Sequence, residues 1–108
     1  MSRLAAGLWV DAYRLRCEAE GIPVYIGARG DATAGAILVK LATLDGRARA
    51  FQRITALDGS RPWDVLAEGD EPEVDAAIAR ARRFDPDLWV VEIEDRLGRH
   101  LLDSPGLD

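Results

Sequence analysis

Residues 80–103 constrain the fold of this chain more than any other stretch. The stretch opens with three arginines at the end of a helical pattern, breaks at Pro86, and continues as an apolar run from Leu88 to Ile93. Proline disfavours helical backbone in the residue before it, so the helix is expected to end there and a buried strand to follow. Residues 95–98 end in glycine and predict a tight turn. Residues 99–102 would then return as a second strand and close a hairpin.

Two segments have the periodicity of amphipathic helices. The first spans about residues 4–20 and ends before Gly21 and Pro23. The second begins near residue 70, where acidic residues and a proline suit a helix N-terminus, and ends near Phe84. In the first helix, the apolar residues that recur at helical spacing are Leu4, Leu8, Ala12, Leu15 and Ala19. This stripe is available either to dock on a sheet or to pair with a second chain.

Four strands are predicted between the two helices. Their ranges are residues 23–26, 35–44 and 47–54, with a less regular fourth at 63–66. Asp45-Gly46 supplies a two-residue hairpin turn between the second and the third, which indicates a mainly antiparallel sheet. The order of elements is therefore α-β-β-β-(β)-α-β-β, with both helices expected on one face of the sheet. We predict a two-layer α+β fold, with a single domain over residues 1–103 and a frayed tail over residues 104–108.

The composition indicates one globular domain. It disfavours two classes of protein, general nucleic-acid binders and membrane-spanning proteins. At 108 residues the chain is long enough for one core. Its net charge of -5 repels phosphate backbones on average, although residues 1–63 carry a net +3 and residues 64–108 a net -8. No apolar run approaches the roughly 20 residues that cross a bilayer. With a single cysteine and no export signal, the chain is expected in the cytoplasm.

Five carboxylates lie within residues 85–95, and three of them form a candidate metal site. Glu92 and Glu94 are two residues apart on a predicted strand, so both point to the same face. Together with Asp87 they could hold Mg²⁺ or Ca²⁺ through oxygen ligands. The order is similar to the motif of metal-dependent nucleases, but Glu94 stands where that motif has lysine, and Asp87 is too close to Glu92. The alternative is a solvated strand face whose carboxylates pair with the arginines of the following turn.

Three arginines on the predicted third strand form a candidate nucleic-acid site: Arg47, Arg49 and Arg53. Alternation along the strand places all three on one face together with Phe51. A basic strip with an aromatic ring can bind single-stranded nucleic acid. The alternative is an edge strand that its charges keep soluble. The acidic net charge of the chain favours this alternative.

No other residues form a recognisable catalytic set. Cys17 lies within the first helix and is expected to be a buried apolar group, and His100 is expected to be structural. One cysteine and one histidine cannot make a four-ligand zinc site, and no glycine-rich phosphate loop is present, so no cofactor is predicted. The tryptophans are expected to fill the core, unless one is exposed and anchors a partner. They are Trp9, Trp63 and Trp89.

The chain also resembles a known family along nearly its whole length. The strings that carry the resemblance are AGLWV at residues 6–10, RGD at 29–31, AGAILVK at 34–40, LDG at 44–46, RFDPDLWVVEIEDR at 83–96 and GRH at 98–100. They resemble the small alphaproteobacterial proteins classed as domain of unknown function 1491. The resemblance implies a stand-alone bacterial cytoplasmic domain with no assigned activity, and it carries no functional residues over to this chain.

These observations favour a non-catalytic binding or protein-interaction module. The expected partner is an unidentified protein or a second copy of the chain, bound through a sheet edge or an exposed tryptophan. One alternative is a divalent-metal-dependent hydrolase or nuclease-like enzyme that uses the three candidate carboxylates. The other is a weak nucleic-acid binder that uses the three strand arginines.

Overall fold

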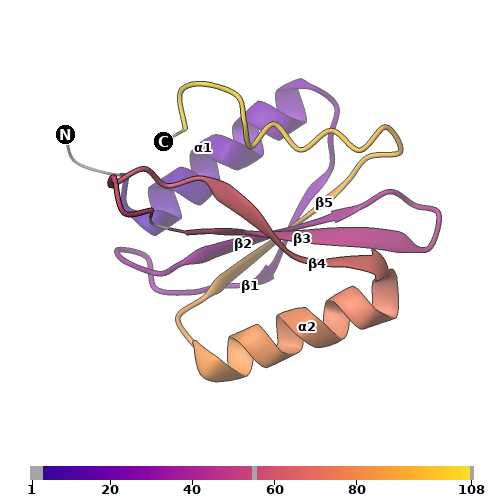
Figure 1. Cartoon of the computed structure of the whole chain (residues 1–108). Coiled ribbons are helices and arrows are strands. Elements are labelled where there is room, and N and C mark those ends of the chain that lie inside the picture. The colour runs from indigo at the N-terminus through magenta and orange to yellow at the C-terminus, as the bar shows by residue number, and fades with distance from the viewer. Residues whose placement is uncertain (1–3, 55, 108) are drawn as a thin grey trace.

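The computed structural model describes residues 4–54 and 56–107, which form two helices and one five-stranded sheet (Figure 1). The helices are α1 (Ala6–Ala19) and α2 (Glu71–Phe84). The strands are β1 (Val24–Ala28), β2 (Ile37–Ala42), β3 (Arg47–Arg53), β4 (Trp63–Asp70) and β5 (Trp89–Glu94). The predicted α+β class and the predicted order of these elements are confirmed. Within the described ranges, no helix is long and apolar enough to cross a membrane.

The sheet is mainly antiparallel, as predicted, with the strands in the order β1-β5-β2-β3-β4. Among the four neighbouring pairs of these strands, only β2 and β5 run parallel to each other, with Val39 opposite Val91. Helix α2 connects the edge strand β4 to β5, which is inserted between β1 and β2. Both sides of β5 are therefore paired within the sheet.

The two helices lie on opposite faces of the sheet, which corrects the predicted two-layer arrangement to three layers. Helix α1 and the C-terminal segment cover one face, and α2 covers the other (Figure 1). The central strands explain the difference, because they are apolar on both faces. Val39 and Val91 belong to the core beneath α1, whereas Leu38 and Val90 belong to the core beneath α2. Strands of this kind need cover on both sides.

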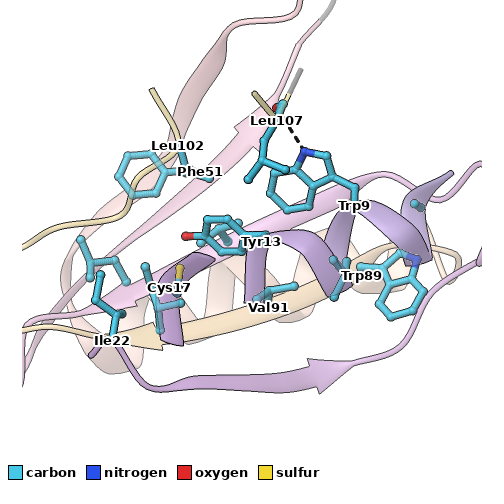
Figure 2. Packing of buried hydrophobic residues seen from close by; sticks show 14 residues of the cluster. Trp9, Tyr13, Cys17, Ile22, Phe51, Trp89, Val91, Leu102 and Leu107 are labelled. Carbon is cyan, nitrogen blue, oxygen red and sulfur yellow. Dashed lines mark hydrogen bonds between the residues drawn. The ribbon is translucent and has the colours of Figure 1, made fainter. Parts of the chain in front are cut away.

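The larger core lies between α1 and the sheet (Figure 2). Trp9, Tyr13 and Cys17 are buried on the inner side of the helix, and the rings of Trp9 and Tyr13 stack with 4.9 Å between their centroids. The polar atoms of both rings have partners in the C-terminal segment. Trp9 donates its indole N–H to the carbonyl of Leu107 at 3.2 Å, and Tyr13 donates its hydroxyl to the carbonyl of His100 at 2.7 Å. These bonds fix the C-terminal segment against α1.

This segment, residues 95–107, is called the C-terminal strap below. It contains no strand, so the predicted return strand at residues 99–102 is wrong. The reason is that β5 already pairs with β1 on one side and β2 on the other, which leaves no free edge beside it. Leu102 and Leu107 are instead buried against the core, and Arg16 donates to the carbonyl of Pro105 at 2.7 Å. Residues 104–107, where the sequence predicts a frayed tail, thus contact α1.

Candidate functional site

The structure places two of the three candidate metal ligands on one face of β5, as predicted. Glu92 and Glu94 share the face toward α2, where a carboxylate oxygen of Glu92 lies 3.9 Å from the Nζ atom of Lys40. Tyr25 donates its hydroxyl to Glu94 at 3.5 Å. Asp87 lies in the loop that precedes β5. In the part of the chain that the structure describes, no three His, Cys, Asp or Glu side chains are grouped so that they could hold a metal ion.

A buried lysine organises the carboxylates on this face. Lys40 lies in the central strand β2 and is only 6% exposed, with its Nζ atom 2.6 Å from Glu71 and 2.7 Å from Asp75. Burial lowers the pKa of Lys40, but hydrogen bonds to Asp75 and Glu71 and the charges of these two residues outweigh burial, so the pKa lies above its usual value. The lysine therefore stays charged at neutral pH. Its ion pairs with Glu71 and Asp75 connect β2 to the first turns of α2.

The three candidate arginines share the face of β3 toward α1, as predicted, but β3 is an interior strand between β2 and β4. It is therefore not the edge strand that the alternative interpretation required. Acidic side chains of β4 pair with two of the arginines. Arg47 lies 3.4 Å from Asp70, and Arg49 lies 3.7 Å from Glu68. The third, Arg53, lies at the other end of the strand, so the predicted basic strip is divided.

Arg53 lies where two hollows in the surface meet. One has a volume of about 390 Å³ and is bordered by the start of α1 and residues 33–36. The other has a volume of about 430 Å³ and is bordered by β3, β4 and the C-terminal strap. The residues that line both are Arg53, Arg61 and Trp63. These volumes are in the range of small-molecule sites.

Trp63 differs from the other two tryptophans, which are buried and donate their indole N–H groups to backbone carbonyls. Its side chain is half-buried, and its indole nitrogen is enclosed without a hydrogen-bond acceptor among the described residues. The guanidinium of Arg53 lies over its ring, 5.1 Å from the centroid, and the ring of Trp9 lies 5.5 Å away. Part of the ring surface is thus already in contact with Arg53 and Trp9, which disfavours Trp63 as a platform for stacking bases.

His100 faces the second hollow as a neutral hydrogen-bond donor. Its Nδ1 atom accepts the backbone N–H of Leu102 at 3.0 Å, so the proton of the neutral ring is on Nε2. Burial lowers the pKa of His100, and this effect together with the charge of Arg49 outweighs the opposing effect of Asp103. The ring is therefore uncharged at pH 7. Protonation would break the bond from Leu102.

Cys17 has the buried, structural environment that the sequence predicts. Its side chain is fully enclosed in the core, and burial raises the pKa of the thiol. The reactive form of a cysteine is the thiolate. A thiol that is both buried and protonated is not a nucleophile at neutral pH.

The outer side of α1 carries an exposed apolar stripe. The residues that the helix buries are Ala6, Trp9, Val10, Tyr13 and Cys17. The leucines of the predicted stripe face the other way, with Leu4 42%, Leu8 56% and Leu15 65% exposed. Ala12 of the same stripe is half-buried and packs against the edge of the core. The three leucines of this stripe are therefore not docked on the sheet.

Sequence reasoning missed two parts of these surfaces. It did not select Arg61, which lies in a loop, because no spacing rule connects this loop to Arg53 on β3. It also could not choose Trp63 among three tryptophans. The only available signal was that Trp63 follows a basic residue and a proline, whereas the other two lie within apolar segments.

Comparison with known proteins places the chain in a family. The family model of DUF1491, a protein family of unknown function, matches residues 4–103, so the chain belongs to the DUF1491 family and the predicted resemblance is confirmed. A crystal structure of a DUF1491 family protein from Caulobacter crescentus CB15 is 46% identical, covers 94% of this chain and 97% of that one, and superposes with a TM-score of 0.86. An NMR structure of a DUF1491 family protein from the same organism is 45% identical, with 97% of both chains covered and a TM-score of 0.84.

A more distant relative has the same fold. The solution structure of protein Atu0922 from A. tumefaciens is 33% identical, covers 86% of each chain, and has a TM-score of 0.74. No curated protein matches the chain.

Proposed function

We propose that this protein is a cytoplasmic, non-catalytic protein-interaction module that pairs with a second copy of itself through the outer face of α1. The observation that supports the proposal most directly is the orientation of this helix. It turns Leu8 and Leu15 outward, and Leu4 precedes them on the same side. Contiguous apolar side chains on the surface of a small protein are typical of interaction surfaces.

The shape of the stripe suits a second copy of the same helix. Leu8 and Leu15 are seven residues apart, and Ala12 and Ala19 each follow four residues after a leucine. This is the alternation of large and small residues that lets two helices approach closely and interdigitate. In an antiparallel pair, the leucines of one helix face the alanines of the other, and a twofold axis gives both copies the same contacts.

The charges beside the stripe are also self-complementary. Asp11 and Arg14 are both exposed and lie one turn apart on the same flank of α1. In the antiparallel arrangement, Arg14 of one copy lies near Asp11 of the other, and the symmetry repeats the contact. Next to Ala19, an open hollow of about 460 Å³ lined by Leu101 and Pro105 offers room for a leucine of the second copy.

The expected pairing is weak. A helix of 14 residues is about 21 Å long, so a contact made mainly by two such helices buries less than the roughly 1,600 Å² of a standard interface. We therefore expect a dissociation constant in the micromolar range, of order 10 to 100 μM.

Variants of the exposed leucines test the proposal. The double variant Leu8→Glu, Leu15→Glu is expected to be monomeric at a concentration where the unmodified protein is largely dimeric, with molar mass measured by light scattering after gel filtration. Leu97→Glu is the matched control, because Leu97 is 81% exposed but lies on the C-terminal strap. An unmodified protein that is monomeric at about ten times the expected dissociation constant would refute pairing. Equal loss of the dimer in the control would show that the contact lies elsewhere.

A further inference from the structure

We propose that His100 is a pH-sensitive latch, which holds the end of the C-terminal strap against α1 while its ring is neutral and loosens the strap when the ring is protonated. His100 is the only histidine of the chain, and it lies where the strap meets Tyr13 of α1. All contacts on which the latch depends lie within one chain. The proposal therefore does not depend on pairing through α1.

The strap makes a strained turn directly after His100. Leu101 has a φ angle of 60°, in the left-handed region that favours glycine. It is one of only two residues other than glycine with a positive φ in the described part of the chain. A leucine stays in this conformation only where neighbouring contacts hold it there. The turn is therefore poised to relax when a contact that closes it is lost.

The side chain of His100 closes this turn. Its Nδ1 atom accepts the backbone N–H of Leu102 at 3.0 Å, so the hydrogen bond spans Leu101. Only a neutral ring can accept this bond, because both nitrogens of a protonated ring carry a hydrogen. Protonation thus sets two donors against each other, and it removes the bond that encloses the strained residue.

The same turn carries the contacts that attach the strap to the core (Figure 2). The backbone carbonyl of His100 accepts the hydroxyl of Tyr13 at 2.7 Å, and the side chain of Leu102 is buried against the core. Further along the strap, the carbonyl of Leu107 accepts the indole N–H of Trp9 at 3.2 Å. A turn that relaxes displaces the first two contacts and weakens the attachment of the residues that follow.

The groups closest to the ring disfavour its protonation on balance. From β3, the guanidinium of Arg49 lies 5.4 Å from the centre of the Phe51 ring, which is 4.7 Å from the ring of His100. From α1, Tyr13 contributes only an uncharged hydroxyl. On the strap, Asp103 favours the protonated ring, but burial and the charge of Arg49 outweigh it. The pKa of His100 therefore lies below its usual value.

The other residues that border the hollow beside His100 add no negative charge. Arg53 on β3 and Arg61 in the loop before β4 carry charges of the same sign as a protonated ring, and β4 contributes only Trp63 and Val65. Because the pKa is lowered by folding, the stability that the neutral ring contributes is fully present above the usual pKa of about 6.5. It is lost as the pH falls through the lower pKa of the folded protein. The latch is thus closed at neutral pH and opens in acid.

Hydrogen exchange of the indole N–H groups, measured by NMR and corrected for the pH dependence of intrinsic exchange, tests the latch. The protection factor of Trp9, whose acceptor lies at the end of the strap, is expected to fall at least about threefold between pH 7.5 and pH 5. Trp89 is the internal control, because its N–H donates to the carbonyl of Asp31, outside the strap. Asp95 stays charged over this range, since Arg99 holds the pKa of its carboxyl below the usual value.

Two substitutions separate the latch from a general effect of acid. His100→Asn keeps an acceptor for the backbone N–H two residues on but cannot be protonated, so Trp9 is expected to be equally protected at both pH values. His100→Ala has no acceptor and is expected to lower the protection of Trp9 already at pH 7.5.

Three results would overturn the proposal: Trp9 of the unmodified protein stays protected in acid, Trp89 loses protection by the same factor, or the asparagine variant responds to acid as the unmodified protein does. The ¹⁵N shifts of the imidazole ring give an independent check that needs no variant. They are expected to place the proton on Nε2 at pH 7.5, and a proton on Nδ1 would equally contradict the latch.

Discussion

At the scale of single residues, the two charged side chains that are buried in the described part of the chain, Lys40 and Asp95, each have an oppositely charged partner. Lys40 is a charged residue within an otherwise apolar strand, and it is kept charged by Glu71 and Asp75. Asp95 has a similar position at the start of the strap, where its carboxylate accepts the backbone N–H of Arg99 at 2.7 Å and the side chain of the same residue at 2.9 Å. This interaction lowers the pKa of Asp95. Each of these two buried charges is thus accompanied by an opposite charge.

Removing the buried cation is expected to destabilise the fold. Lys40→Met leaves Glu71 and Asp75 together without a counter-charge, so we expect the free energy of unfolding to fall by about 2 kcal/mol. The loss is smaller than for a fully buried pair, because both carboxylates are partly exposed. Urea unfolding followed by tryptophan fluorescence measures the change. Arg96→Met, at an exposed position, is the control and is expected to change stability by less than about 0.5 kcal/mol. A Lys40→Met protein as stable as this control would show that the buried cation is not needed.

The sequence contains part of this information. A lysine inside the run from Ile37 to Ala42 is visible as an exception to an apolar pattern. Its partner Glu71 lies 31 residues away in the sequence, on another element, and no periodicity connects the two. The pairing could be found only once the fold had placed the start of α2 over β2.

At the scale of elements, α1 shows how two apolar stripes can compete on one helix. The sequence identifies the leucine and alanine stripe, but the helix buries the side that carries Trp9 and Tyr13. Aromatic residues bury more area than leucines, and both of these rings find hydrogen-bond acceptors in the strap. Those acceptors are 98 and 87 residues away in the sequence, so local spacing could not reveal which of the two stripes would be buried.

The strap is the element that the sequence described least well, and its contacts are expected to be stabilising. Leu107→Ala removes a buried side chain next to Trp9 and is expected to lower the free energy of unfolding by about 2 kcal/mol. Leu97→Ala removes an exposed side chain of the same strap and is expected to cost less than about 0.5 kcal/mol. Thermal or urea unfolding of both variants gives the comparison. If the two substitutions have equally small effects, the end of the strap is frayed in solution, as the sequence predicts.

At the scale of the whole molecule, the fold class followed from the sequence but the number of layers did not. Hairpin turns and proline breaks identified nearly every element. The signal for three layers was also present, because the runs in β2 and β5 are almost continuously apolar and such strands are usually covered on both faces. The hollow of about 430 Å³ beside the strap could not be predicted from the sequence, since it is assembled from β3, β4, a loop and the strap.

Pairing of the outer face of α1 with a second copy is the central claim, and intermolecular nuclear Overhauser effects test it most directly. The sample mixes ¹³C-labelled and unlabelled protein at a concentration well above the expected dissociation constant, and the spectrum selects contacts between the two kinds of chain. We predict contacts between the methyl groups of Leu8 or Leu15 on one copy and those of Ala12 or Ala19 on the other. Intermolecular contacts confined to another surface, such as the edge strand β1, or none at all, would contradict the claim.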